Sequence, residues 1–433
     1  MPVQDFLRFV SQSPSAFHAC HSACQHLLSA GFQPLNELAP WSVVPGGRYF
    51  VTRNQSSVIA FRVPARGVAP CQIVASHSDS PSFKLKPHAE EDALGHYLRL
   101  NVEKYGGMIM STWLDRPLSI AGRVLVRQGD GVVSRLVNLD WDSVLIPNMP
   151  IHFARDINDG YKFNPQVDML PLYGDERARG RLTADLARVA SVSEEDILAA
   201  DLFLYNRMSG SVWGAQDEFF SCPRIDDLEC AYTSLSAFLA AENGANTAVY
   251  ALFDNEEVGS GTKQGAAGTF LADVLFRLYA ALGATDAQAR ALLSASFMVS
   301  ADNAHAVHPN HPEIYDADNR TFMNGGVVIK HNANQKYTTD AVSCAAFAAV
   351  CQAANVPVQH FSNRSDLAGG STLGNIANTH TSMNTVDIGL AQLAMHSSYE
   401  TAGTADVDFM IAALRRFYET EIRFTGDGCF TLA

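Results

Sequence analysis

An apolar, strand-like run meets a group of acidic side chains in the segment Val249-Tyr-Ala-Leu-Phe-Asp-Asn-Glu-Glu257. The segment Cys71-Gln-Ile-Val-Ala-Ser-His-Ser-Asp79 has the same organisation. In an open α/β sheet, ligands collect outside the carboxyl ends of parallel strands, so residues far apart in the sequence can meet there. Two more runs fit this pattern, Phe297–Ser300 ahead of Asp302 and Leu390–Met395 ahead of His396. The four runs predict one shared site in an α/β fold.

The side chains that follow these runs are those that bind metal ions and move protons. His77 offers a neutral ring nitrogen to zinc, and Asp79 can accept the other ring N–H and fix the tautomer. Glu256 and Glu257 repel one another unless a cation or a shared proton neutralises them. One of the two can therefore bind metal while the other handles protons. The alternative for this pair is a solvated helix N-terminus, where acidic residues are also favoured.

Asp226 is the expected bridge between two metal ions. Dinuclear hydrolases hold their ions about 3.5–4 Å apart, a gap that one carboxylate can span. Asp226 and Asp227 precede a predicted helix, and we expect Asp227 to cap it. Asp302 adds an oxygen donor and His396 a nitrogen donor, so the sequence predicts a dinuclear hydrolytic site with room for water.

Longer motifs surround these residues: His77-Ser-Asp79-Ser-Pro81, Asp254-Asn-Glu256-Glu257-Val-Gly-Ser, Ser300-Ala-Asp302-Asn-Ala-His305-Ala-Val-His308-Pro-Asn and Leu393-Ala-Met-His396-Ser. In order and context they resemble the aspartyl aminopeptidase family of dinuclear zinc metallopeptidases. The similarity runs nearly end to end, from Ser13-Pro-Ser-Ala-Phe-His18 to the last predicted helix. The expected cofactors are therefore two divalent ions, zinc first, although imidazole and carboxylate donors suit cobalt and manganese as well.

The resemblance implies roles for individual residues. It places His77, Asp226 and Asp302 on one ion and Asp226, Glu257 and His396 on the other. Glu256 becomes the general base, and Asp79 supports the chemistry through His77. These assignments imply an aminopeptidase that acts on peptides with a free N-terminus.

Specificity for an N-terminal Asp or Glu is also implied by the resemblance. The family places a lysine against the acidic side chain of the first residue of the substrate, and Lys330 matches that lysine. We expect Tyr337 to assist Lys330 and His305 to touch the substrate. Asp302 is available for the free α-amino group. Without the family context Lys330 would be a solvated loop lysine, and the pocket would then suit neutral residues.

An inserted domain is predicted at residues 86–214, where short alternating runs are separated by turns such as Gly129-Asp-Gly131. It interrupts a catalytic domain of residues 1–85 and 215–433, which we expect to contain a mixed sheet flanked by helices, of the zinc-peptidase type. The helices of that domain are predicted near the N-terminus, where one ends at Gly31, and at Leu228–Ala241, Phe270–Ala281, Thr339–Ala354 and Val407–Phe424.

The resemblance gives the insertion a role in assembly. In relatives this domain dimerises the subunits, a histidine from it enters the active site of the neighbour, and the dimers build a tetrahedral dodecamer. Pro150-Ile-His152-Phe fits the context of that histidine. A surface histidine in a loop is the alternative.

Charge and composition exclude several classes of partner. The formal net charge of −14 argues against nucleic acid and anionic membranes, which need a basic footprint. Since no stretch approaches the roughly 20 apolar residues of a membrane span, we expect a cytoplasmic protein. The cluster His18, Cys20, His21, Cys24 and His26 suggests a zinc site, but its spacing favours helix packing.

Two other functions compete with the acidic aminopeptidase. One is a metallopeptidase of the same fold that cleaves neutral N-terminal residues. The other is a scaffold or cargo assembly protein with little catalysis. The intact set of His77, Glu256, Glu257 and His396 argues against a scaffold, which has no need of paired carboxylates.

Overall fold

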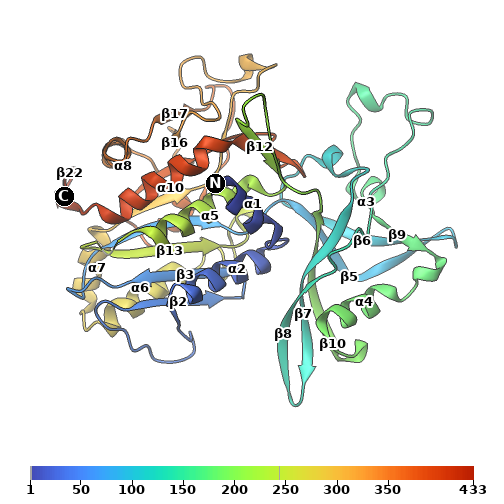
Figure 1. The fold of residues 1–433 in the computed structure, drawn as a ribbon, viewed down its shortest axis with the longest axis horizontal. Coiled ribbons are helices and arrows are strands. Elements are labelled where there is room, and N and C mark those ends of the chain that lie inside the picture. Colours follow the sequence, from blue (N-terminus) through green and yellow to red (C-terminus); the bar gives the residue numbers. More distant parts are fainter. Residues whose placement is uncertain (1, 243) are drawn as a thin grey trace.

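A nine-stranded mixed sheet forms the centre of the computed structural model, which describes residues 2–242 and 244–433 (Figure 1). The strand order is β1 (Gln33–Pro34), β2 (Arg48–Arg53), β3 (Ser57–Arg62), β13 (Thr247–Phe253), β4 (Cys71–His77), β14 (Phe297–Ala301), β18 (Asn384–Gly389), β16 (Val327–His331) and β17 (Val358–Ser362). Strands β13, β4, β14 and β18 run parallel, whereas β3 and β16 pair antiparallel with their neighbours β13 and β18. The expected mixed sheet is confirmed.

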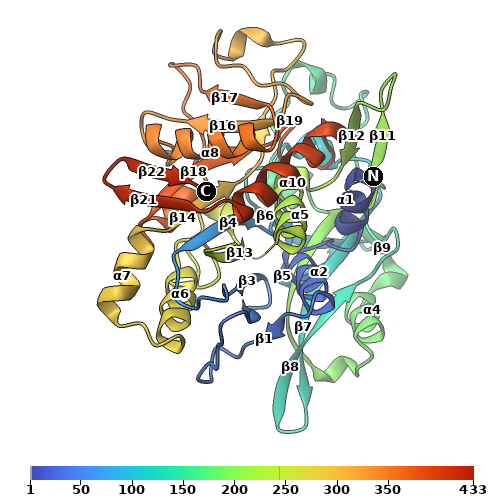
Figure 2. The same cartoon turned by 60° about the vertical axis from the view of Figure 1, so that its left-hand side comes forward.

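Helices cover both faces of this sheet because its strands are apolar on both sides. Tyr250 and Leu252 of β13 belong to one hydrophobic cluster, and Val249, Ala251 and Phe253 belong to another. The first cluster contains residues of α2 (Ala16–Ser29), α5 (Ile225–Ala240), α8 (Ala341–Ala353) and α10 (Thr404–Glu419). The second contains residues of α6 (Phe270–Ala281), α7 (Asp286–Ser294) and α9 (Leu373–Ala377). Figures 1 and 2 show α5 and α10 on one side of the sheet and α6 and α7 on the other.

Three of the four predicted strand runs are confirmed as β4, β13 and β14, but the fourth is wrong. Strand β18 ends at Gly389, before the predicted run Leu390–Met395 begins. That run instead contributes β19 (Ala391–Leu393) to a separate five-stranded sheet. Leu390 and Ala391 are buried there too, so the apolar pattern could not tell the two sheets apart. The order of the second sheet is β11 (Ser211–Trp213), β12 (Phe219–Cys222), β20 (Glu400–Gly403), β19 and β15 (Ala304–His305).

The predicted helices are present, with one boundary to correct. Helix α10 ends at Glu419, and the residues from Ile422 onward form the hairpin of β21 (Ile422–Gly426) and β22 (Cys429–Leu432). Phe424 follows Phe417 by seven residues, a spacing that a continuous helix would also bury on one face. Helix α1 (Pro2–Ser11) was not anticipated. Within residues 2–242 and 244–433, no helix combines the length and the apolar character that crossing a membrane requires.

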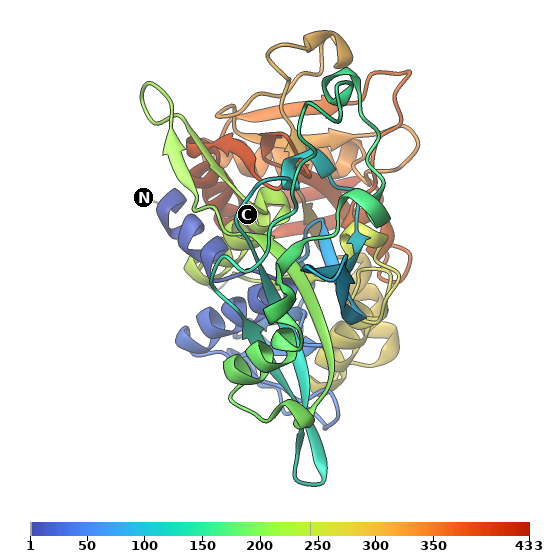
Figure 3. The ribbon, with the colours of Figure 1, turned by 90° about the vertical axis from the view of Figure 1, so that its right-hand side faces the viewer.

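A six-stranded antiparallel sheet lies beside the nine-stranded one and faces the viewer in Figure 3. Phe83, Leu100, Leu118 and Ile120 are fully buried in its own hydrophobic cluster. Helices α3 (Pro165–Asp168) and α4 (Arg181–Ala190) accompany it. The strand order is β8 (Gly131–Asn138), β7 (Leu118–Gln128), β10 (Ile197–Asn206), β5 (Ser82–Ala93), β6 (Tyr97–Tyr105) and β9 (Leu172–Asp175). The division into residues 1–85 with 215–433 and residues 86–214, and the dimerising role of the insertion, stay predictions.

Candidate metal centre

The ends of three adjacent parallel strands bring the predicted ligands together. His77 is the last residue of β4, and Asp302 directly follows β14. Strand β13 leads through Asp254 into the short 3-10 helix η5 (Glu256–Val258), which carries both glutamates. Because β13, β4 and β14 are neighbours in the sheet, their carboxyl ends open at one edge.

Asp226 lies between the two predicted histidine ligands and faces each with a different oxygen. Its Oδ1 lies 3.4 Å from Nε2 of His77, and its Oδ2 lies 3.2 Å from Nε2 of His396. Asp226 is at the start of α5, where its φ of −78° and ψ of 109° depart from helical values. The non-helical backbone and the facing oxygens give Asp226 the arrangement of a bridging ligand.

Two groups of potential ligands share Asp226. One contains His77, Asp226, Asp227 and Asp302, and the other contains Asp226, Glu257 and His396; within each group, one ligand atom per residue lies within 4.8 Å of the others. The buried oxygens Oδ1 of Asp226, Oδ1 of Asp227 and Oε1 of Glu257 accept no hydrogen bond from any described residue. Buried acceptors without donors are costly unless a cation neutralises them. The residues therefore fit zinc, which takes imidazole and carboxylate donors.

The electrostatics of the cluster favour the same conclusion. Burial raises the pKa of Glu256 to about 8, against the lowering effect of His77. Burial also raises the pKa of Glu257. The pKa of His396 moves to about 10 because Asp226 and Glu257 outweigh the opposing effect of burial. In the absence of a cation, protons must compensate the charge here, so metal binding at this cluster would release protons.

Asp79 positions both the histidine ligand and the two glutamates. The nearest acceptor to Nδ1 of His77 is the Asp79 carbonyl oxygen at 3.1 Å, with the Asp79 carboxylate at 3.4 Å. That carboxylate accepts the backbone N–H groups of Glu256 at 3.1 Å and Glu257 at 3.2 Å. It also accepts the hydroxyl of Tyr105, which lies 2.6 Å away on β6 of the six-stranded sheet. Sequence reasoning missed Tyr105 because no motif surrounds it.

A second residue that was missed, Glu400, holds the other side of the centre. Its carboxylate accepts the backbone N–H groups of Ile225 at 2.6 Å, Asp226 at 3.1 Å and His396 at 2.7 Å. The ring of His396 is also oriented, since its Nδ1 lies 2.6 Å from the carbonyl oxygen of Gly107. Glu400 follows His396 by four residues, so an acidic residue so close to a predicted ligand was a usable signal.

The predicted cap role of Asp227 is wrong. Asp227 is fully buried, and its Oδ2 accepts the backbone N–H of His77 at 3.0 Å. The residue before the first helical position of α5 is Arg224, and no side chain caps the helix there. Because α5 begins against the end of β4, the Asp227 carboxylate, which would cap a solvated helix, instead joins α5 to β4 by a hydrogen bond.

The three predicted substrate residues lie on neighbouring segments. The Nζ of Lys330, on β16, lies 2.8 Å from the carbonyl oxygen of Asn303 and 3.9 Å from Oδ1 of Asp302. Tyr337 is buried, and its ring centroid lies 5.5 Å from the Lys330 Nζ. His305 is exposed on β15.

His152 does not belong to either ligand group of this chain. It lies in an exposed turn between β8 and α3, next to Phe153. The structure thus brings Lys330 to the metal ligands through Asp302 but leaves His152 on the surface.

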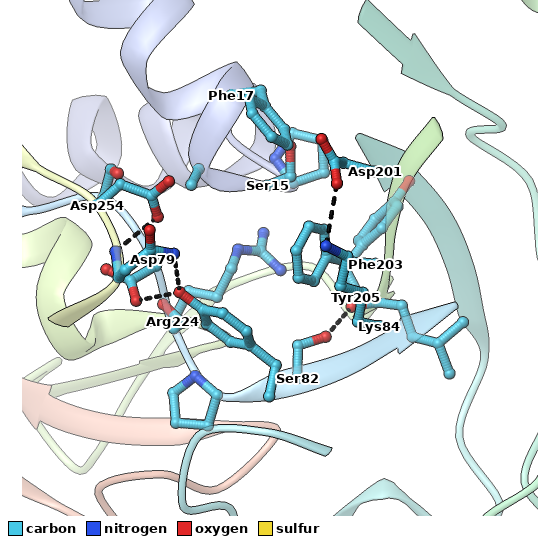
Figure 4. A pocket seen from close by; sticks show the side chains of 18 of the residues that line it. Ser15, Phe17, Asp79, Ser82, Lys84, Asp201, Phe203, Tyr205, Arg224 and Asp254 are labelled. Atoms are coloured by element: carbon cyan, nitrogen blue, oxygen red, sulfur yellow. Dashed lines mark hydrogen bonds and ion pairs between the residues drawn. The ribbon is translucent and has the colours of Figure 1, made fainter. Parts of the chain in front are cut away.

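A cavity of about 410 Å³ lies behind the ligands, between the nine-stranded and six-stranded sheets (Figure 4). Asp79 and Asp254 border it from the metal side. Lys84 and Asp201, which form an ion pair with 3.0 Å between Nζ and Oδ1, border it from the six-stranded sheet. Side chains of both sheets therefore line one cavity next to the candidate metal centre.

Comparison with known proteins identifies the family of the chain. The model of the aminopeptidase I zinc metalloprotease family (M18) matches residues 9–418. The chain belongs to this family. It is 44% identical over 418 residues to the probable M18 family aminopeptidase 2 of Clostridium acetobutylicum, covering 95% of this chain and 96% of that relative. The M18 family includes aspartyl aminopeptidase, so the resemblance seen in the motifs is confirmed, and the protein is a zinc metallo-aminopeptidase.

Solved structures of the M18 family share the whole fold. The cryo-EM structure of the Ape4 and Nbr1 complex contains a chain that matches with a TM-score of 0.93 and 36% identity, over 96% of this chain and 85% of that one. The S. cerevisiae mApe1 dodecamer matches with a TM-score of 0.85 and 26% identity, over 96% of this chain and 95% of that one. The zinc-peptidase type of fold expected from the sequence is therefore confirmed.

Proposed function

We propose that this M18 aminopeptidase holds two zinc ions and releases N-terminal Asp or Glu from peptides. The observation that carries the proposal is the position of Asp226, whose two carboxylate oxygens face His77 and His396 beside the buried Lys330. One carboxylate presented to two imidazoles is the arrangement of a shared ligand. A buried ammonium close by suits an acidic side chain.

The donor set divides naturally between two ions. His77, Asp226 and Asp302 would hold one ion, and Asp226, Glu257 and His396 the other. Zinc, when bound, lowers the pKa of water and polarises the peptide carbonyl. Cobalt or manganese would suit the same donors.

Glu256 is the residue we assign to proton transfer. It takes the proton of the attacking water and returns it to the nitrogen of the leaving peptide. Its backbone is held by the Asp79 carboxylate, and its own carboxylate lies within 4.8 Å of ligand atoms of His77 and Glu257. Asp79 thereby orients the base and one histidine ligand together.

Lys330 is the residue we assign to substrate selection. Its ammonium has three N–H donors, and the Asn303 carbonyl takes one of them at 2.8 Å. The residue is only 3% exposed, and a charge-assisted bond is about twice as strong as a neutral one. We assign the free α-amino group of the peptide to Asp302, with Tyr337 and His305 beside the pocket.

Kinetics on Asp, Glu and Leu anilides test this assignment. For Lys330→Met we expect kcat/KM on the Asp anilide to fall roughly 10- to 100-fold, the worth of a hydrogen bond to a charged group, with little change on the Leu anilide. Lys336→Met, which removes an exposed lysine six residues away, is the matched control and should change neither.

Other outcomes would support other functions. A wild-type enzyme that prefers the Leu anilide would identify a neutral aminopeptidase of the same fold. Equal losses on both anilides in Lys330→Met would show that Lys330 holds Asp302 and does not read the substrate. Turnover that survives complete chelation would refute the metal assignment itself.

We further propose that the chain self-associates through residues near His152, as dimers that build a tetrahedral dodecamer. Large apolar side chains surround this histidine on the surface: Met149 is 51% exposed, Ile151 47% and Phe153 82%. Exposed apolar clusters of this kind are typical of interaction sites. The relative mApe1 forms a dodecamer. In such an assembly His152 would enter the active site of the neighbouring subunit and donate to the developing oxyanion.

Mixing two inactive variants tests the transfer of His152 between subunits. His152→Ala and Glu256→Gln should each lose most turnover, yet their co-assembled mixture should recover part of it, because one site then combines an intact base with an intact histidine from its neighbour. Light scattering gives the oligomeric state of each sample. A mixed oligomer without recovered turnover would contradict the shared site, and wild-type assembly without turnover on any peptide would support a scaffold.

A further inference from the structure

A second group of side chains that could bind a metal lies on the last two strands of the nine-stranded sheet, away from the acidic centre on the central strands. It consists of His331 at the end of β16, His360 on the edge strand β17 and Cys344 on α8. One ligand atom of each lies within 4.8 Å of the other two. The proposed aminopeptidase chemistry uses none of them.

The distance between the two imidazoles of this group suits coordination of a single ion. Nε2 of His331 lies 3.0 Å from Nδ1 of His360. Two nitrogens bound to tetrahedral zinc at about 2.0–2.1 Å are roughly 3.3 Å apart, so an ion could replace the shared proton with little movement of either ring. The two ring centroids lie 5.2 Å apart with an interplanar angle of 33°, which leaves both rings side by side.

The backbone explains why the three side chains meet. Strands β16 and β17 are parallel, and Ile329 is the partner of His360 in their register. His331 follows Ile329 by two residues, so its side chain points to the same face of the sheet. Helix α8 covers this face, since its Phe347 packs with Ile329 in the hydrophobic core, and Cys344 precedes Phe347 by three residues. Figure 2 shows α8 beside β16 and β17.

We propose that His331, Cys344 and His360 form a third metal site that binds one Zn²⁺ or a similar divalent transition-metal ion, with water as the remaining ligand. Imidazole nitrogen and thiolate sulfur are both donors that zinc takes, and three protein ligands leave a position for water. The thiolate separates this site from the dinuclear centre, whose donors are nitrogen and oxygen alone. Lys330 points away from it, because adjacent residues of a strand face opposite sides.

Burial and exposure are both favourable for loading this site. His360 is exposed, so an ion can reach the group from solvent. Burial, together with the neighbouring His360, lowers the pKa of His331, which keeps that ring neutral as a ligand must be. Burial raises the pKa of the Cys344 thiol, so its proton would leave as the metal binds. A bound ion would join the edge strand β17 to β16 and α8.

Cobalt titration of the full-length protein, kept reduced with a phosphine, tests the site without relying on activity. Thiolate bound to Co²⁺ gives a charge-transfer absorption in the near ultraviolet that nitrogen and oxygen donors do not give. We expect this absorption in the wild type and its loss in both Cys344→Ser and His360→Ala. Cys429→Ser, which removes an exposed cysteine on β22, is the matched control and should retain it.

Zinc content supplies a second measurement on the same proteins. After equilibration with Zn²⁺, the wild type should carry one more ion per chain than Cys344→Ser, while both turn over substrate alike because the dinuclear centre is intact. His360→Ala changes an exposed residue, so it provides a folded variant if Cys344→Ser is unstable. Absence of the thiolate absorption in the wild type, or its persistence in Cys344→Ser, would overturn the proposal.

Discussion

The nine-stranded and six-stranded sheets contribute to the metal centre in different ways. In the nine-stranded sheet, the parallel strand β4 ends at His77, β13 leads into the two glutamates, and β14 is followed by Asp302. These residues are the candidates for binding metal or moving protons. The six-stranded sheet contributes groups that hold other residues in place, such as Tyr105, which donates to Asp79. Parallel strands deliver side chains to one edge, whereas an antiparallel sheet closes its ends with turns. Within one chain, the candidate ligands and base of these two sheets therefore lie at the ends of the nine-stranded sheet, and the six-stranded sheet supports them.

The largest expected effect comes from removing the proposed base of the nine-stranded sheet. Glu256→Gln should lower kcat by about 10²- to 10⁴-fold, because the amide cannot accept the proton of the attacking water. Metal analysis should show unchanged ion content. Glu313→Gln changes an exposed glutamate and should leave kcat as it was. Full turnover in Glu256→Gln would show that the nine-stranded sheet does not supply the base through Glu256.

Removing metal ions with a chelator should destabilise the nine-stranded sheet more than the six-stranded sheet. Ligands that bind only the folded state stabilise it by about 4 kcal/mol at 1,000 times Kd, so removing the ions should lower local amide protection by up to roughly 10³-fold. The loss should concentrate in β4, β13 and β14, next to the buried acidic groups that must take up protons when the ions leave. Hydrogen exchange measures this strand by strand. Equal losses in β7 and β10 would mean that the sheets unfold as one unit.

A smaller effect is expected from the supporting sheet. Tyr105→Phe removes the hydroxyl that donates to Asp79 at 2.6 Å, and partners of this kind typically contribute 10- to 100-fold to metal affinity or activity. Competition with a chelator and kcat/KM measure the two quantities. Tyr97→Phe, on the same strand and 53% exposed, should be neutral.

A double variant identifies the path of the Tyr105 effect. In an Asp79→Asn background, Tyr105→Phe should add little, since residues in one hydrogen-bond network are not additive. Full additivity of the two substitutions would show that Tyr105 acts elsewhere.

The expected ligands were found from the sequence, whereas the supporting residues Tyr105 and Glu400, which come from other sheets, were missed. His77, Asp302 and the two glutamates could be found because each follows an apolar run directly. Tyr105 contacts the centre only after separate sheets have packed together, and no local pattern records that packing. Glu400 was missed although its position four residues after His396 offered a signal. Asp227 was misassigned because a carboxylate before a helix has the same local signature whether it caps the helix or accepts a bond from another strand.

For the cysteine and histidine residues, closeness in the sequence and closeness in the fold also differ. Histidines and cysteines are closely spaced in the sequence around His18 and Cys20, yet Cys20, on α2, packs into the hydrophobic core as predicted. His331, Cys344 and His360 are spread over 30 residues with nothing in their spacing to connect them. Only the register of β16 and β17 and the placement of α8 bring them within reach of one ion.

The carboxylate of Asp226 has a thermodynamic consequence for the proposed dinuclear centre. Because its two oxygens face different histidines, an ion held by one histidine would fix a ligand available to an ion held by the other, and the two loading equilibria would be linked by a coupling free energy. Reciprocity then requires that each bound ion change the affinity of the centre for the other ion by the same factor. A shared ligand that favours the second ion by more than the two cations repel each other would make the centre fill over a narrow range of free metal concentration, with few singly loaded chains.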